Sequence, residues 1–187
     1  STFEFVTVLM SIIVGLGITR VLSGLSALIE LRDSVTFDWL TLMWSLNIFS
    51  FHVIFWWVVV NNWRSLEEWT FLRFGPLVLY SVFLYFCAAL VLPARPQKGL
   101  DLKTRFEAIR RPFFILLLLV LISELLDSGQ KGMDYVFSEL GLLYLVIIGG
   151  SLAFTVAAIW VSDRRFQALW AIVFFVTYWS WTLSQFR

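Results

Sequence analysis

The sequence predicts an all-α integral membrane protein, a compact bundle of six transmembrane helices, and three observations support this prediction. First, hydrophobic residues make up 60% of the 187 residues and the mean hydropathy is +0.85, whereas soluble chains contain about 45–50% apolar residues. Second, several apolar runs approach or exceed the ~20 residues that a helix needs to cross about 30 Å of hydrocarbon. Third, these runs lack the polar–apolar alternation of a membrane barrel, and a backbone in lipid must satisfy its own hydrogen bonds.

Four spans are predicted from runs without any charge, at residues 39–63, 74–94, 140–162 and 166–186. Two more runs each contain one charged residue, because Arg20 lies in the first apolar run and Glu124 lies in the fourth. The six helices are expected at about residues 4–31, 37–63, 70–93, 112–128, 134–161 and 164–186. Since most connections are short, we expect residues 1–187 to form a single transmembrane domain.

A basic segment precedes the fourth span. We expect a separate short helix over residues 101–111, capped by Asp101, and we expect Pro112 to begin or kink the next helix. Its apolar face would lie on the membrane while its basic side chains contact anionic lipid headgroups. These basic side chains are Lys103, Arg105, Arg110 and Arg111. The alternative is a solvated loop, because charges beside spans follow from the positive-inside rule alone.

The basic residues also predict an orientation. If the 94–111 connection faces the cytoplasm, nine Lys and Arg residues lie inside and four lie outside, with Arg20 in the membrane. We therefore expect a multi-pass protein of a bacterial-type inner membrane with both termini outside.

Small residues recur at every fourth position in two of the predicted helices. The first helix has Ser11, Gly15, Thr19 and Ser23, and the fifth has Gly149, Ala153 and Ala157. Such small-residue ridges let helices approach closely in lipid. We therefore expect the first and fifth helices to form the centre of the bundle or a contact between protomers, and we expect a homo-oligomer or a membrane-protein partner.

The two halves of the chain contain similar stretches. ITRVLSGL at 18–25 resembles ISELLDSG at 122–129, and Glu124 stands at the place of Arg20. Because each half would contain three helices, such a repeat would be inverted across the bilayer, as in several transporter folds. Chance similarity between Leu-rich helices is the alternative.

Among the Lys, Arg, His, Asp and Glu residues, three lie inside the apolar runs: Arg20, His52 and Glu124. A buried charge is costly in lipid, so Arg20 is expected to reach the headgroups, to pair with Glu124, or to line a polar pathway. His52 is expected to be a structural residue bonded to a hydroxyl, with Ser45 on the same helix face, and the alternatives are proton relay and haem ligation. Asp127, Asp134 and Glu139 are expected to be hydrated at the outer interface, with an acidic mouth formed by the three as the alternative.

The motifs for common chemistry are absent from the sequence. It contains no phosphate-binding glycine loop, no zinc-protease motif and no cysteine pair, so no cofactor or metal is expected. The net charge of +1 does not favour nucleic-acid binding. An enzymatic role is left open, although no residue spacing calls for one.

The first hypothesis for the function is permeation or transport of a small ion or solute, with Arg20, Glu124 and His52 lining the route. The alternative is a non-catalytic accessory subunit of a membrane complex.

Overall fold

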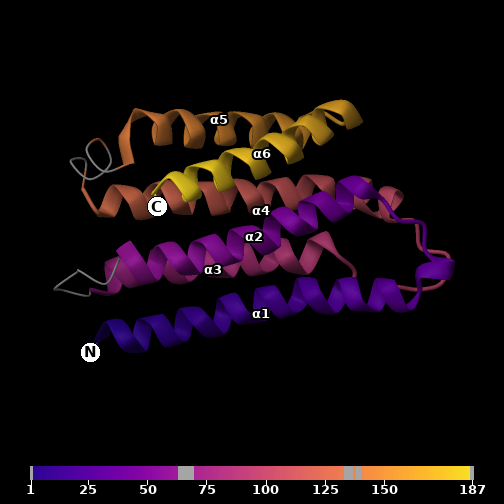
Figure 1. The fold of residues 1–187 in the computed structure, drawn as a ribbon, viewed down its shortest axis with the longest axis horizontal. Coiled ribbons are helices and arrows are strands. Elements are labelled where there is room, and N and C mark those ends of the chain that lie inside the picture. The colour runs from indigo at the N-terminus through magenta and orange to yellow at the C-terminus, as the bar shows by residue number, and fades with distance from the viewer. Residues whose placement is uncertain (1, 63–69, 133–136, 138–139, 186–187) are drawn as a thin grey trace.

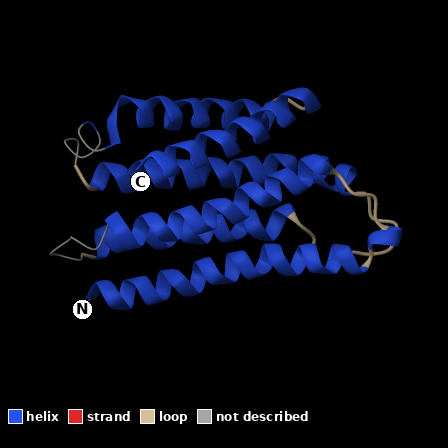
Figure 2. Ribbon diagram, viewed as in Figure 1, coloured by secondary structure: helices blue, strands red, loops and turns tan. Residues whose placement is uncertain are grey.

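The apolar segments of the chain form six long helices in the part that the structure describes (Figure 1). A computed structural model describes residues 2–62, 70–132, 137 and 140–185. The helices are α1 (Thr2–Glu30), α2 (Trp39–Asn62), α3 (Phe71–Val91), α4 (Leu102–Gln130), α5 (Gly141–Trp160) and α6 (Arg164–Gln185), and a short 3-10 helix, η1 (Arg32–Ser34), follows α1. Figure 2 shows these helices joined by loops, with no strand among the described residues.

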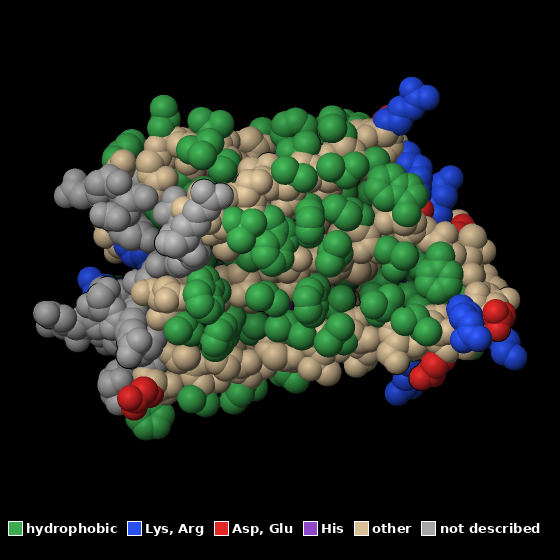
Figure 3. All heavy atoms as spheres, viewed as in Figure 1, with side chains coloured by type: hydrophobic (Ala, Val, Ile, Leu, Met, Phe, Trp, Pro, Cys, Tyr) green, Lys and Arg blue, Asp and Glu red, His purple; other side chains and the backbone are tan. Residues whose placement is uncertain are grey.

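The helices identify a multi-pass membrane protein. Five of them, α1, α2, α3, α5 and α6, are long and apolar enough to cross a membrane. The side chains agree, because in Figure 3 apolar side chains cover much of the side of the bundle, while Lys and Arg gather at the end that holds the α1–α2 and α3–α4 connections. The protein therefore contacts a lipid bilayer through its helix faces.

The arrangement of the helices in the bundle differs from the one that the sequence predicts. Helices α1, α3, α4 and α5 pack side by side in that order, and α2 and α6 pack against this row and against each other. Helices α1 and α5 thus lie at opposite edges in Figure 1, and the prediction that they form the centre of the bundle is wrong. The centre is formed by α3 and α4, which pack against each other along much of their length.

The small-residue ridges explain this difference. On α1 the buried face consists mainly of larger residues, Met10, Val14, Val21 and Leu28, whereas Thr19 and Ser23 are exposed. On α5 Gly149 and Ala153 are exposed as well. Large side chains make more dispersion contacts inside the bundle than small ones, so much of each ridge faces outward, although Ser11 accepts a hydrogen bond from Trp56 of α2. Their role as a contact between protomers stays a prediction.

The basic segment and the fourth span form one helix, not two. Helix α4 runs without interruption from Leu102 to Gln130 and contains Pro112. Asp101 caps it as expected, because its side chain accepts hydrogen bonds from the backbone N–H groups of Lys103 and Thr104. Tertiary packing holds the helix on both sides of the proline. Before it, Arg105 donates to carbonyl oxygens of α3, and after it, Phe113 and Phe114 pack on Trp44 of α2.

The described residues show no internal repeat. A 3+3 repeat would give α4 and α6 the packing that α1 and α3 have, but α4 packs instead on α3 and α5.

An aromatic core fills the half of the bundle near the basic end. Trp44 of α2 is fully buried, and its ring lies edge-on to Phe113 at 5.5 Å and to Phe114 at 5.1 Å. Trp170 and Phe174 of α6 complete the cluster from the other side. This packing joins α2, α4 and α6, so the same three helices are held in place where they continue past the core toward the opposite end.

Candidate functional site

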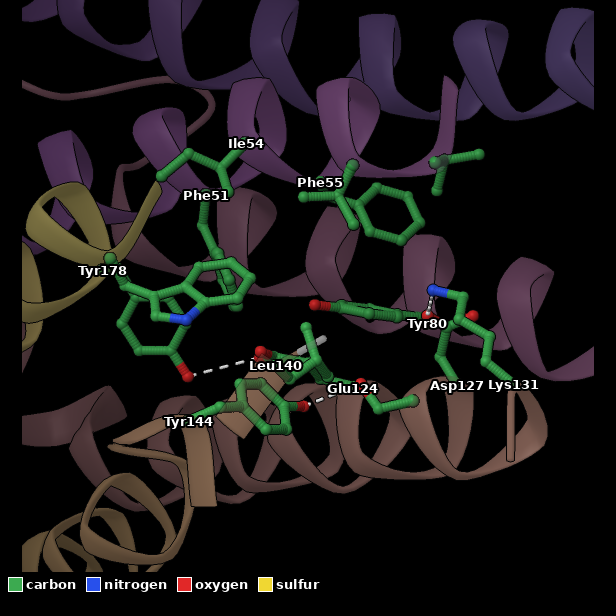
Figure 4. A pocket seen from close by; sticks show the side chains of 14 residues that line it. Phe51, Ile54, Phe55, Tyr80, Glu124, Asp127, Lys131, Leu140, Tyr144 and Tyr178 are labelled. Atoms are coloured by element: carbon green, nitrogen blue, oxygen red, sulfur yellow. Dashed lines mark hydrogen bonds and ion pairs between the residues drawn. The ribbon is translucent and has the colours of Figure 1, made fainter. Parts of the chain in front are cut away.

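A polar cavity lies between five helices, toward the end of the bundle opposite the basic connections. It has a volume of about 40 Å³, room for roughly two or three water molecules. Its lining comes from α2, α3, α4, α5 and α6 and from residues at the ends of α4 and α5 (Figure 4). The lining residues are Phe51, Ile54, Phe55, Val58, Val59, Tyr80, Glu124, Asp127, Ser128, Lys131, Leu140, Tyr144, Tyr178 and Trp181.

Helix α4 supplies most of the charge in the cavity. Glu124, Asp127 and Lys131 follow one another at intervals of three and four residues, so they lie on one face of the helix. This face points into the cavity because α4 packs against α3 and α5 on its flanks. The short helical spacing thus brings two carboxylates and one ammonium group into the same small space.

Glu124 is held by tyrosines from two other helices. The hydroxyl of Tyr178 on α6 donates a hydrogen bond to a carboxylate oxygen of Glu124 at 3.2 Å (Figure 4). The hydroxyl of Tyr80 on α3 is a second donor directed at the same carboxylate. Glu124 itself is half-buried, whereas both tyrosines are buried. A carboxylate can accept about four hydrogen bonds, so Glu124 has room for further donors from the cavity.

Asp127 and Lys131 form a buried ion pair beside Glu124. The ammonium nitrogen of Lys131 lies 2.8 Å from a carboxylate oxygen of Asp127, and the two side chains are 8% and 9% exposed. Nearby, the hydroxyls of Ser128 and Tyr144 lie 2.8 Å apart and share a hydrogen bond. The pair therefore compensates its own charges, and its desolvation is offset by direct contact.

The charges of the described lining do not cancel when Glu124 is ionised. Glu124 and Asp127 then carry two negative charges and Lys131 one positive charge, so one negative charge remains. Because an isolated charge is costly in a low-dielectric site, the cavity favours either a proton on Glu124 or a bound cation.

Aromatic rings form much of the remaining wall. The Phe55 and Tyr80 rings lie 4.3 Å apart, and the Phe51 and Tyr178 rings lie 4.9 Å apart. The indole N–H of Trp181 is buried and has no acceptor within the part of the chain that the structure describes. Such a wall excludes bulk water and presents ring faces that attract cations.

Arg20 lies outside this cavity and does not pair with Glu124. Its guanidinium donates to the backbone carbonyl oxygens of Leu92 at 2.9 Å and Ala89 at 3.3 Å, at the end of α3. The last carbonyls of a helix have no partner within the helix, so they attract the guanidinium more directly than a carboxylate on a distant turn. Of the three alternatives for Arg20, the pair with Glu124 is wrong.

His52 is also separate from the cavity. It is fully buried where α1 meets α2, and its Nδ1 lies 2.7 Å from the carbonyl oxygen of Ile48, so Nδ1–H is the donor. The expected hydroxyl partner is wrong, because Ser45 donates instead to the Thr41 carbonyl. Arg20, His52 and Glu124 therefore occupy three different places and do not line one route.

The basic side chains of α4 divide into two groups. Arg110 is 8% exposed and donates to carbonyl oxygens at the end of α5, those of Ala158, Ile159 and Val161. Arg105 donates to Leu90 and Val91 at the end of α3. The structure thus gives Arg105 and Arg110 partners in the bundle, where the sequence suggested lipid headgroups. Lys103 and Arg111 are exposed, and their lipid contacts stay a prediction.

Several cavity residues were missed by the sequence reasoning. The three tyrosines were not singled out, because an apolar helix gives no sign of which neighbour a tyrosine will face. Asp127 was expected to be hydrated at the outer interface, with an acidic mouth as the alternative, and Asp134 and Glu139 of that mouth lie outside the described residues. The spacing of Asp127 and Lys131, one turn apart, was a signal for the ion pair that could have been used.

The described residues include no group of three His, Cys, Asp or Glu side chains that could hold a metal ion. Comparisons with protein families, with curated proteins and with solved structures found no match. What the site can do is therefore argued from its own chemistry, a carboxylate with an uncompensated charge in a small aromatic cavity.

Proposed function

We propose that this protein transports a proton or a small cation across the bilayer and binds it at Glu124. The observation that carries the proposal is that the charges of the described lining do not cancel when Glu124 is ionised, in a cavity formed by five helices. Ionisable residues at membrane depth are expensive, and they typically mark ion pathways and proton relays. The buried ion pair of Asp127 and Lys131 keeps the neighbouring charge constant, so the charge of the site changes at Glu124.

The proposal includes the topology of the bundle. Helix α4 is the sixth span, because its part after Pro112 packs between α3 and α5, both of which are long and apolar enough to cross the membrane. With the basic connections in the cytoplasm of a bacterial-type cell, the cavity lies nearer the outer face. Arg20 and His52 act as structural residues that hold α1 against α3 and α2.

Flux measured in reconstituted vesicles tests this function. Wild-type protein should carry protons or a monovalent cation down an imposed gradient, and Glu124→Gln should reduce the flux at least about tenfold because the binding charge is lost. Glu107→Gln is the matched control, since Glu107 is an exposed carboxylate on the same helix, and it should leave the flux unchanged. Absence of wild-type flux, or equal flux in the Glu124→Gln protein, would refute the proposal.

A second candidate function is supported by the outward-facing ridges. A Cβ atom added at Gly15 or Gly149 would have no neighbour within 4 Å, so each ridge is open to another helix. Such a surface suits a non-catalytic subunit that packs against a membrane partner or a second copy. Replacing Gly15 or Gly149 by Leu should then release the partner during gentle purification while the monomer keeps its thermal stability, and retention of the partner in both variants would argue against this role.

A further inference from the structure

The geometry points to a small protonated amine, ammonium or methylammonium, as the cation that this cavity takes. The inference rests on the proposed function and specifies the chemistry of the ligand. Three properties of the cavity support it: the arrangement of its oxygen atoms, its size and aromatic walls, and an ammonium group that it already contains.

The oxygen atoms suit an N–H donor better than a metal ion. A hard divalent metal such as Mg²⁺ or Ca²⁺ needs about six to eight oxygen ligands around it. Here the hydroxyls of Ser128 and Tyr144 bond to each other, and that of Tyr178 donates to Glu124. Glu124 keeps acceptor capacity of its own, because a carboxylate accepts about four hydrogen bonds. An ammonium ion can donate to that carboxylate and leave its other side against ring faces.

The size and walls of the cavity match a small organic cation. A volume of about 40 Å³ admits an ammonium ion, which is about as large as water, or methylammonium with its single methyl group. Phe51, Phe55 and Tyr80 supply ring faces and apolar contact for such a group. A water molecule beside the cation could accept the N–H of Trp181, which has no acceptor among the described residues.

The protein already holds one primary ammonium in this cavity. Lys131 is buried in the lining and bonds to Asp127 at 2.8 Å. Glu124 lies one helical turn before Asp127 on the same face. An amine ligand on Glu124 would therefore repeat, one turn away, a pairing that this cavity accommodates with a residue of its own, and it would neutralise the remaining negative charge.

Binding of radiolabelled methylammonium by the purified full-length protein in lipid nanodiscs tests the inference. Wild-type protein should bind it saturably, unlabelled ammonium should compete, and sodium, potassium and magnesium at equal ionic strength should not. Glu124→Gln should weaken binding at least about tenfold, because one charge-assisted hydrogen bond is lost. Phe55→Leu should weaken it about threefold, because one ring face is lost while the apolar contact stays. Glu107→Gln should bind like wild type.

Separate outcomes distinguish the inference from the function on which it rests. If sodium or potassium competes as well as ammonium, or if Glu124-dependent proton flux occurs without methylammonium binding, the amine assignment is overturned and the transport proposal stands. If the Glu124→Gln protein keeps full binding and full flux, both are overturned. Glu124→Asp gives a second variant that retains the charge, and intermediate binding is expected from it if Glu124→Gln does not fold.

Discussion

His52 leaves no room for a side chain at residue 17. The imidazole is fully buried, Nδ1–H bonds to the Ile48 carbonyl, and Nε2 faces the backbone of Gly17 so closely that an added Cβ atom would overlap it. Glycine in mid-helix costs about 0.5–1 kcal/mol relative to alanine, so the close packing of α1 on α2 must offset this loss. The glycine at this position is therefore required by a neighbouring helix and not by the conformation of its own helix.

Gly17→Ala should destabilise the protein by about 1–3 kcal/mol, because the overlap with His52 forces a buried ring or a helix to move. Gly15→Ala, two residues away, should be neutral or stabilise by up to about 1 kcal/mol, because no atom lies within 4 Å of its added Cβ. Thermal unfolding of both variants in the same detergent measures the difference. Adding His52→Ala to Gly17→Ala should restore part of the loss, and no restoration would show that the contact is not the cause.

At the scale of helices, the ends of α3 and α5 are completed by arginines from other elements. Arg20 of α1 and Arg105 of α4 donate to the last carbonyls of α3, and Arg110 donates to those of α5. These carbonyls carry the negative end of the helix dipole, so cationic donors are favoured there. The sequence places Arg105 and Arg110 beside the membrane and Arg20 inside an apolar run, but only the packing shows that the three arginines bridge helices.

Arg110→Ala should destabilise the fold by about 1–3 kcal/mol, because the Ile159 carbonyl at the end of α5 loses its donor, while Gln167 still donates to the carbonyls of Ala158 and Val161. The adjacent residue gives the matched control. Arg111 is exposed, and its guanidinium lies 5.9 Å from the centre of the Trp160 ring, so Arg111→Ala should cost no more than about 1 kcal/mol. Chemical or thermal unfolding of the two variants side by side is the measurement. A smaller loss for Arg110→Ala than for Arg111→Ala would contradict the bridging role.

At the scale of the whole molecule, charge and hydrophobicity are separated along the bundle. Most of the described Lys and Arg residues lie at one end, and apolar side chains cover the side of the bundle seen in Figure 3. Large apolar residues in the middle of helices, such as Leu16, Leu79 and Ile172, are exposed. The connection between α3 and α4 is held at the basic end by backbone bonds, since Thr36 N–H donates to Leu100 and Leu102 N–H donates to Thr36. The structure is therefore polarised along the direction that would cross the membrane.

Cysteine labelling tests the orientation. Lys98 lies in the exposed basic connection, and Thr70 is exposed at the start of α3, so the two positions should face opposite sides of the membrane. In a Cys87→Ser background, an impermeant maleimide should label Thr70→Cys in intact cells and Lys98→Cys only after the cells are opened. The reverse pattern would place the cavity nearer the cytoplasm.

Much of the secondary structure could be predicted from the sequence, because each apolar helix is decided by residues that are near one another in the chain. The ends of α2, α3 and α6 lie within about two residues of those expected. The main error, a break at Pro112, arose because the local preference of proline was given more weight than packing on both of its sides. The small-residue ridges were identified, but the prediction that they place α1 and α5 at the centre of the bundle was wrong, since a helix sequence does not state which face meets a neighbour.

The sequence by itself determined that the protein lies in a membrane, where most of its helices run, and which connections are basic, because hydropathy and the positive-inside rule depend on local composition. Only the tertiary structure decided the partners of Arg20, His52 and Glu124. The hydrogen-bond partners of Arg20 and Glu124, and the packing neighbour of His52, Gly17, lie far away in the chain on other helices. Three ionisable residues that look equivalent in the sequence thus become a helix cap, a packing residue and a cavity carboxylate, because the alignment of helices sets which polar atoms are within reach.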